Sequence, residues 1–293
     1  MAKGPNQRVV HGDDLLYRFF NDLFLEDSEL AEQLPVRMIA SMGIWLPLEI
    51  YYEWPVMLPW VVRDATCRGN LKRQIPDQWG APDEYGFLRD DNSLIKGLTR
   101  SLSVRTPIRG GLHGARMGTE FVASHIWRVI DHAGLASRHP LLNSFVPNLV
   151  WLPSQVSKLS DRESGPVQLA LQSISWQIYR HAPVAAHLLE VVKEAWTLVP
   201  EPKQSVDHMP DLNWFEPTDR FRSTRRARLD TVLEALQRLD RGQSLEQKVI
   251  TTRYGDGLPH VSESARSELL RHLHRFQSSS DLPVVPPEPG TES

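Results

Sequence analysis

Apolar side chains recur at helical spacing close to the N-terminus: Leu15, Leu16, Phe19, Phe20 and Leu23. Spaced in this way, they fall on one face of a helix and leave the other face to polar residues. Asp13 or Asp14 stands just before the run, where a carboxylate can accept hydrogen bonds from the free amides of a first turn. We expect a helix that runs to about Gln33.

A second apolar segment, Met38 to Val62, contains no lysine or arginine and is dense in aromatic residues: Trp45, Tyr51, Tyr52, Trp54 and Trp60. Glu49 and Glu53 argue against a membrane span, because two carboxylates in mid-bilayer would cost roughly 5 kcal/mol or more. Prolines also interrupt any single helix across the segment. We expect buried globular structure and no membrane segment. A stacking platform for nucleic-acid bases is the alternative use of such aromatics.

Two short apolar runs in the middle of the chain, Phe121 to Ile126 and Leu149 to Leu152, favour β-strands. The loop between them contains asparagine, serine and proline residues that favour turns. Ser154 can then cap a short helix that begins near Gln155. Strand, loop, strand and helix together predict a ββα unit.

This unit would hold His125 and Asn148 close together, although 22 residues lie between them. His125 stands near the end of the first strand, and Asn148 stands at the start of the second. Asn143, Ser144 and Pro147 supply the turn chemistry between them. We take His125 and Asn148 as the candidate centre of the site.

The remainder of the chain predicts helices. One begins at Pro166 and reaches Arg180, a second opens at Pro183, and a last amphipathic helix spans roughly Ser262 to Phe276. Residues 278–293 are rich in serine and proline, and with no means of burying a core they predict a disordered tail.

We therefore expect an α+β fold that is mainly helical, with a small central ββα-metal-like unit flanked by helical segments. Along the chain we expect an N-terminal helical and aromatic-rich region (1–96), a ββα core (97–165), a C-terminal helical region with an arginine-rich segment (166–277) and the tail (278–293). A hydrophobic fraction of 41% is ample for a core in a chain of 293 residues.

Net charge and cysteine usage narrow the class of protein. A formal charge of -3 does not by itself indicate a nucleic-acid-binding protein, so any such surface must be local. Cys67, the only cysteine, excludes an internal disulfide framework and a cysteine-rich zinc site, and it fits a reducing cytosol. The N-terminal residues lack the apolar core of a secretion signal. We expect a cytoplasmic location.

Positive charge gathers in two places. Between Lys96 and Arg128, glycines interleave with arginines, and such a mixture suits close approach to a phosphate backbone. The run from Arg220 to Arg228 holds five arginines in nine residues and leads into a helix with one apolar face. The candidate nucleic-acid contacts are Arg109, Arg116, Arg128, Lys158, Arg222, Arg225 and Arg226. An ordinary solvated surface is the alternative for both runs.

A further polar cluster comprises Asp90, Asp91 and Lys96, which invites comparison with a carboxylate–carboxylate–lysine nuclease site. The alternation that a strand requires is poor around these residues. A solvated turn and a helix cap are the other interpretation of the cluster.

The central motifs resemble those of the HNH (ββα-metal) nucleases. Ala-Ser-His-Ile at 123–126 is similar to the family's first motif, and Pro-Asn-Leu-Val-Trp-Leu at 147–152 is similar to its central asparagine motif. In a common subgroup a third histidine follows nine positions after the asparagine, with an aspartate four positions further on. Here these positions hold Ser157 and Asp161. The resemblance covers about 45 of the 293 residues.

This resemblance implies a metal-dependent DNA endonuclease of restriction or defence character. It makes His125 the general base and Asn148 the residue that orients it. A divalent cation, Mg²⁺ or Mn²⁺, would act at the scissile phosphate as a Lewis acid and electrostatic clamp. Asp161 and Ser157 occupy the metal positions, although a serine hydroxyl is a poor ligand for a hard cation compared with a carboxylate.

Two other functions stay open. One is a non-catalytic nucleic-acid-binding or protein-interaction module built on an eroded HNH core. The other is unrelated chemistry in a pocket around Glu120, His125 and Arg128. DNA is the partner that the resemblance implies, and a homodimer is compatible with it.

Overall fold

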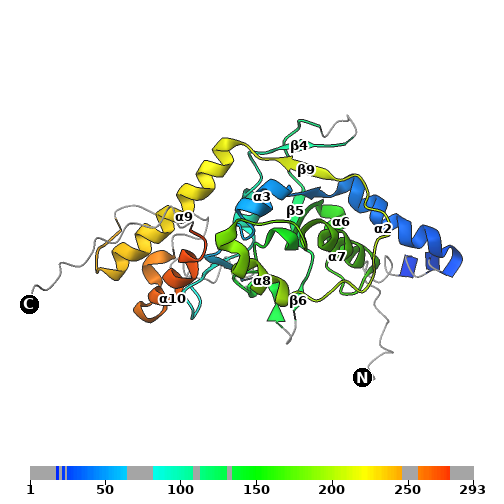
Figure 1. Ribbon diagram of the computed structural model, residues 1–293. Coiled ribbons are helices and arrows are strands. Elements are labelled where there is room, and N and C mark those ends of the chain that lie inside the picture. Colours follow the sequence, from blue (N-terminus) through cyan, green and yellow to red (C-terminus); the bar gives the residue numbers. More distant parts are fainter. Residues whose placement is uncertain are drawn as a thin grey trace, which may run out of the picture.

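The computed structural model describes residues 18–19, 22–23, 25–64, 82–107, 113–130, 134–245 and 257–277. A mixed sheet lies at the centre of this structure, and helices surround it (Figure 1). Within the described residues most regular structure is helical. The expected mainly helical α+β fold is therefore confirmed.

Five strands form the central sheet, in the spatial order β4 (Ser103–Arg105), β9 (Asn213–Glu216), β1 (Ile44–Trp45), β8 (Leu149–Pro153) and β5 (Phe121–His125). The short strand β1 pairs parallel with β9 and antiparallel with β8. The other neighbours, β4 with β9 and β5 with β8, are antiparallel. The strands come from the N-terminal, central and C-terminal regions of the chain, so these regions share one sheet.

Two smaller sheets stand beside the central one. Strands β2 (Val61–Arg63) and β3 (Leu88–Asp90) pair in parallel. Strands β6 (Val129–Ile130) and β7 (Gly134–Leu135) form an antiparallel pair inside the loop that joins β5 to β8. Arg63, the last residue of β2, also lines the pocket that is described below.

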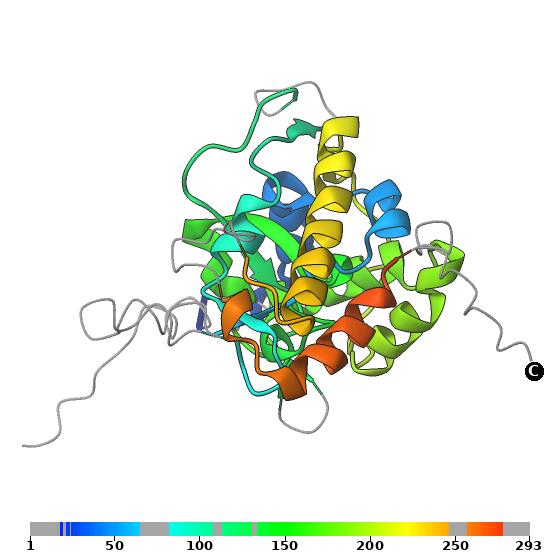
Figure 2. The same ribbon diagram turned by 90° about the vertical axis from the view of Figure 1, so that its left-hand side faces the viewer.

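The helices are α2 (Ser28–Met42), α3 (Leu48–Glu53), α5 (Ser93–Gly97), α6 (Ser154–Ser160), α7 (Pro166–Tyr179), α8 (Leu189–Thr197), α9 (Asp219–Asp240) and α10 (Glu263–His274). Single 3₁₀ turns occupy Ala136–Arg138, Val146–Asn148, Ala186–Leu188 and Leu258–His260. Helices α9 and α10 pack together at one end of the molecule, and α2 lies toward the other end (Figure 1). Figure 2 faces the α9–α10 end and shows both helices in front of the sheet.

The first predicted helix is wrong at its end, because the helical residues 18–19, 22–23 and 25–26 are followed by a separate helix, α2. The predicted start at Asp13 or Asp14 lies outside the described residues. Asp27 caps helix α2, because its Oδ1 accepts a hydrogen bond from the amide of Leu30 at 2.9 Å. The helix then continues past Gln33 to Met42 and stops at Gly43, where a Cβ atom would lie 2.7 Å from the carbonyl oxygen of Ile39. Leu15, Leu16 and Phe20, which belong to the same prediction, lie outside the described residues.

The aromatic segment is core, as expected. Trp45, Tyr51 and Trp60 are fully buried, and Trp54 is nearly so, whereas Tyr52 is exposed. The indole of Trp196 donates a hydrogen bond to the hydroxyl of Tyr51 at 2.9 Å. Among the described helices, not one combines the length and apolarity that crossing a bilayer requires.

Most helices after the ββα unit lie where we expect them. Helix α7 begins at Pro166, and α10 closely matches the predicted last helix. The helix expected from Pro183 is wrong at its start, since α8 begins at Leu189. A 3₁₀ turn, Ala186–Leu188, directly precedes α8, and residues 182–185 before that turn have no regular structure. The amide of Ala185 donates to the carbonyl of Tyr52 at 3.0 Å. The tail, residues 278–293, lies outside the described residues.

Candidate functional site

The ββα unit is present. Strands β5 and β8 pair antiparallel over five residue pairs, from Phe121 opposite Pro153 to His125 opposite Leu149. Helix α6 follows β8 directly and packs against β5. The predicted cap is wrong in detail, because Pro153 occupies the cap position, and the amide of Ser154 donates to the carbonyl of Glu120 at 2.7 Å.

Asn148 fastens the loop between the two strands. Its side-chain oxygen accepts from the amide of Trp127 at 2.7 Å, and its side-chain nitrogen donates to the carbonyl of Leu142 at 3.0 Å. Its own carbonyl accepts from the amide of Ile126 at 3.0 Å. Asn148 is fully buried, so both ends of the loop are fixed to a side chain that water does not reach. It lies close to His125 in the chain fold, but its amide group bonds to the loop and not to the imidazole.

His125 is oriented by a different residue. Its Nε2 lies 2.8 Å from the main-chain oxygen of Asn143. A carbonyl oxygen can only accept a hydrogen bond, so Nε2 must carry the proton, and Nδ1 keeps its lone pair. Asn143 follows Leu142, which Asn148 holds. Asn148 therefore orients His125 indirectly: it holds Leu142, and the carbonyl of the next residue, Asn143, contacts the imidazole.

Burial keeps the His125 imidazole neutral. The side chain is only 6% exposed. The pKa of His125 is lowered from 6.5 to about 4. Desolvation is the main cause, the hydrogen bond to Asn143 opposes it, and the guanidinium groups of Arg63 and Arg128 add to the lowering. A neutral imidazole with a free Nδ1 is the form in which histidine accepts a proton or binds a metal.

Sequence reasoning missed the importance of Asn143, which we expected only to form a turn. Its side-chain nitrogen donates to the carbonyl of Val61 at 2.9 Å. The residue thus joins strand β2 to the loop that orients His125. A second contact joins the same loop to the chain just before β2, where the hydroxyl of Ser144 accepts from the amide of Leu58 at 2.7 Å.

A pocket of about 110 Å³ opens beside His125. It is lined by Arg63, Asn92, Val122, Ala123, Ser124, His125, Arg128, Leu135, Ser137, Ser157 and Asp161. The site thus brings together four residues that the sequence singled out: His125, Arg128, Ser157 and Asp161. Glu120 is not part of the lining, and it lies near Gln155 on the surface.

Arg128 contacts Asp161 at the edge of the pocket. Nε of Arg128 lies 3.8 Å from Oδ1 of Asp161, and the same guanidinium donates to the main-chain oxygen of Asp161. The side chain of Asp161 is 64% exposed, so water screens this ion pair. Ser157 is buried, and its hydroxyl donates to the carbonyl of Ser154 at 3.0 Å.

These residues do not fit a divalent cation. Asp161 is the only carboxylate among the described residues that line the pocket, and two guanidinium groups lie beside it. The described part of the chain contains no group of three or more His, Cys, Asp or Glu side chains placed to hold a metal ion. Mg²⁺ and Mn²⁺ prefer carboxylate and other oxygen ligands, and a net positive lining disfavours either cation.

The polar cluster at Asp90 is a helix cap. Its Oδ1 accepts from the hydroxyl of Ser93 at 2.6 Å, and its Oδ2 accepts from the amide of Leu94 at 2.9 Å. Burial raises the pKa of Asp90 above its usual range. Both carboxylate oxygens bind groups in the first turn of α5, as expected of a helix cap. The expected solvated turn is wrong, because Asp90 and Asp91 are buried.

The expected nucleic-acid contacts are dispersed. Arg116 and Lys158 are exposed, and Arg116 pairs with strand β4 through Ser103. Nε of Arg222 lies 3.1 Å from a carboxylate oxygen of Glu53. Arg226 is exposed on α9. Arg109 lies outside the described residues.

Arg225 is not placed to contact a phosphate. It is 2% exposed, and its guanidinium lies 5.9 Å from the ring centroid of Trp54 and 5.5 Å from that of Trp60. No nitrogen of this guanidinium has a hydrogen-bond partner within the described residues. Burial lowers the pKa of Arg225 to about 9. We therefore correct the expectation for Arg225, because its side chain faces the core.

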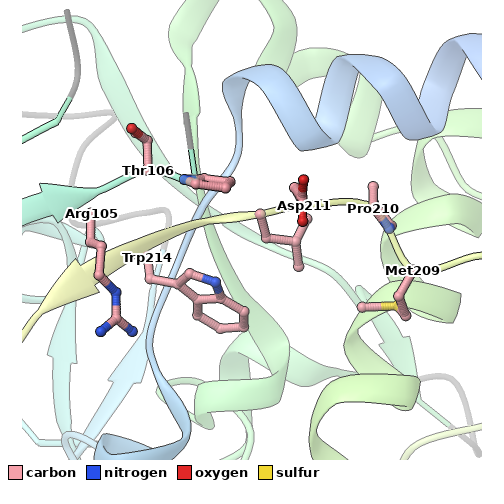
Figure 3. Close-up of a pocket in the computed structure, with 8 residues that line it drawn as sticks. Arg105, Thr106, Met209, Pro210, Asp211 and Trp214 are labelled. Carbon is pink, nitrogen blue, oxygen red and sulfur yellow. The ribbon is translucent and has the colours of Figure 1, made fainter. Parts of the chain in front are cut away.

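A second cavity, of about 350 Å³, lies at the opposite edge of the sheet. Arg105 and Trp214, which face each other across β4 and β9, line it together with Thr106, Pro107, Met209, Pro210, Asp211 and Leu212 (Figure 3). Figure 3 shows the Trp214 indole with the Arg105 side chain beside it. The lining contains no histidine or cysteine and no paired carboxylates. The pocket at His125 is thus the better candidate for chemistry.

Comparison with known proteins finds no matching protein-family model, no similar curated protein and no similar solved structure. The resemblance to HNH nucleases therefore remains a prediction from two sequence motifs. Function has to be argued from the site itself.

Proposed function

We propose that this chain is a nucleic-acid phosphodiesterase of the HNH type, in which His125 is the general base. One observation carries the proposal: the imidazole of His125 is held by the Asn143 carbonyl with Nδ1 unprotonated, in a pocket lined by Arg63 and Arg128. A base and two cations in one small pocket are what hydrolysis of a phosphate diester requires.

The chemistry divides between the two kinds of residue. Nδ1 of His125 takes a proton from a water molecule while the oxygen of that water molecule attacks phosphorus. The guanidinium groups offset the negative charge that grows on the phosphate oxygens. The bond from phosphorus to the leaving oxygen breaks, and that oxygen takes a proton from water. No step here is assigned to a metal ion, because the lining does not fit one.

The pKa of His125 bears on this role. A value of about 4 keeps the imidazole neutral but makes it a weak base. A bound phosphate diester carries a negative charge, which opposes the effect of Arg63 and Arg128 and raises the pKa of a nearby imidazole. Substrate binding would thus make His125 a stronger base.

A second candidate is a nucleic-acid-binding module without catalysis, built on an eroded HNH core. The observation that favours it is the single carboxylate of Asp161 in the lining, together with the hydroxyl of Ser157 at the third motif position. In this case the pocket would bind phosphate and leave it intact.

Cleavage assays separate the two candidates. Supercoiled plasmid, single-stranded DNA and RNA would each be incubated with Mg²⁺, with Mn²⁺ or with excess chelator. We expect cleavage that His125→Ala reduces about a hundredfold or more. His187→Ala, at an exposed histidine, is the control and should cleave like the wild type. Binding without cleavage of any substrate would support the module, and cleavage equal in His125→Ala would contradict our proposal.

A further inference from the structure

Arg63 is a cation that the sequence did not single out. It ends strand β2 and lines the pocket, and its Nε is buried without a hydrogen-bond partner among the described residues. The adjacent acid, Asp64, pairs with Arg89, with Oδ2 of Asp64 3.2 Å from Nη1 of Arg89. A buried guanidinium donor without an acceptor costs free energy, and among the described residues nothing offsets this cost, so Arg63 is suited to an acceptor supplied by a ligand.

Asn92 supplies a second unfilled group in the same pocket. It is 7% exposed, and its backbone is left-handed with φ at 80°. Its side-chain nitrogen lies 3.4 Å from the carbonyl of Ala123, while its side-chain oxygen is buried and has no partner among the described residues. Two residues that line the pocket, Arg63 and Asn92, thus each have one buried side-chain atom without a partner among the described residues.

One kind of ligand satisfies both groups. A phosphate diester offers anionic oxygens to a guanidinium, and a water molecule hydrating that phosphate offers a proton to the oxygen of Asn92. A metal ion would satisfy Asn92 but not Arg63. The charges of the lining agree, because Arg63 and Arg128 stand against Asp161 alone and His125 is neutral.

We infer that this pocket binds the phosphate of a nucleic acid directly, through Arg63 and Arg128, with no divalent cation between protein and ligand. Arg63 takes the place that a metal ion would hold, and Asn92 positions a water molecule beside the phosphate. The inference deepens the proposed function and rests on it for the identity of the ligand. Binding itself is measurable without cleavage.

The test is fluorescence anisotropy of a short fluorescein-labelled DNA duplex, in excess chelator and again with Mg²⁺. The variants are Arg63→Gln, Arg63→Lys and the matched control Arg89→Gln. Arg89 lies on the neighbouring strand, opposite Val62, and does not line the pocket. Removing either arginine changes the net charge equally, so the comparison isolates the pocket contact. Thermal unfolding of each variant checks that it is folded.

We expect equal affinity with chelator and with Mg²⁺. Arg63→Gln should weaken binding about tenfold or more, since a hydrogen bond to a charged group is lost. The affinity of Arg89→Gln should stay within about twofold of wild type, because Arg89 does not line the pocket and its guanidinium pairs with Asp64. The affinity of Arg63→Lys should lie between those of the wild type and Arg63→Gln, because lysine keeps the positive charge but lacks the planar guanidinium group. Inorganic phosphate should compete with the duplex for wild type.

Three results would overturn the inference: binding only with Mg²⁺, unchanged affinity in folded Arg63→Gln, or equal losses in Arg63→Gln and Arg89→Gln. Failure of the proposed function looks different. Binding that needs Arg63 and no metal, in a protein that cuts no substrate, would remove the nuclease and keep the phosphate site.

Discussion

The main-chain oxygen of Asn143 lies 2.8 Å from Nε2 of His125, and this contact fixes which imidazole nitrogen carries the proton. Nε2 must donate, so Nδ1 is left as the base. The carbonyl is itself held in place, because Asn148 bonds the preceding residue, Leu142, and Asn143 bonds strand β2 at Val61. The geometry of the base thus depends on two asparagines that never react.

Asn148→Ala should destabilise the protein strongly. The substitution leaves the buried amide of Trp127 without its acceptor and removes the shorter of the two hydrogen bonds to the carbonyl of Leu142, which still accepts from the amide of Phe145 at 3.4 Å. An unsatisfied buried amide costs about 1–3 kcal/mol and a lost hydrogen bond about 1 kcal/mol, so we expect a loss of about 2–4 kcal/mol in the free energy of unfolding, measured with urea. Gln155→Ala, on the exposed side of α6, should cost less than about 0.5 kcal/mol. Equal losses in the two variants would contradict the role of Asn148.

Folding stability should fall as the pH drops below 6.5. Between the unfolded pKa of 6.5 and the folded pKa of about 4 for His125, the unfolded chain binds the extra proton. The contribution of His125 to the free energy of unfolding is therefore fully present above pH 6.5. It decreases as the pH falls toward 4, by about 3 kcal/mol in total.

Urea titrations across this pH range would measure the effect. His125→Gln should give a shallower dependence, and His187→Gln should match the wild type. His125→Gln should keep a remaining slope, because burial also lowers the pKa of His272, to about 4, and that of His139. An unchanged slope in His125→Gln would show that the imidazole is solvated and not buried.

Arg225→Met should stabilise the protein. The guanidinium is buried, and its three nitrogens lack hydrogen-bond partners among the described residues. The cation–π contacts of Arg225 with Trp54 and Trp60 stabilise the fold by about 1–2 kcal/mol. Desolvation of an unpaired charge costs more, several kcal/mol. Methionine keeps the apolar stem without the charge. We expect a higher melting temperature and unchanged DNA affinity.

Arg226→Gln is the matched substitution for Arg225→Met, because Arg226 is the next residue of α9 and is exposed. It should leave the melting temperature unchanged and, if α9 lies along the nucleic acid, weaken binding in a salt-dependent way. A lower melting temperature for Arg225→Met would show that the cation–π contacts outweigh desolvation.

The sequence predicted those parts of the fold that depend on local pattern. Strands β5 and β8, helix α6 and the buried aromatic segment all follow from short-range periodicity. It could not show that β1, two residues long, lies at the middle of the sheet between β8 and β9. Such a strand has no pattern of its own, and partners far along the chain decide its position.

The site was predictable in part for the same reason. His125, Arg128, Ser157 and Asp161 belong to one ββα unit, and they line one pocket. Arg63 and Asn92 come from β2 and from the turn before α5, which reach the pocket only through tertiary packing. Arg225 looked like its neighbours in an arginine-rich run, and only the turn of the helix places it against Trp54 and Trp60.

The most direct test of the central claim is ¹⁵N NMR of the His125 side chain, with free protein and with a non-cleavable phosphodiester, from pH 4 to 8. The assignment would come from the His125→Gln spectrum. We expect a neutral ring protonated on Nε2 down to about pH 5 in the free protein, and a higher pKa when the ligand is bound. A ring protonated on Nδ1, or one that titrates near 6.5 and ignores the ligand, would contradict our account of His125 as the base.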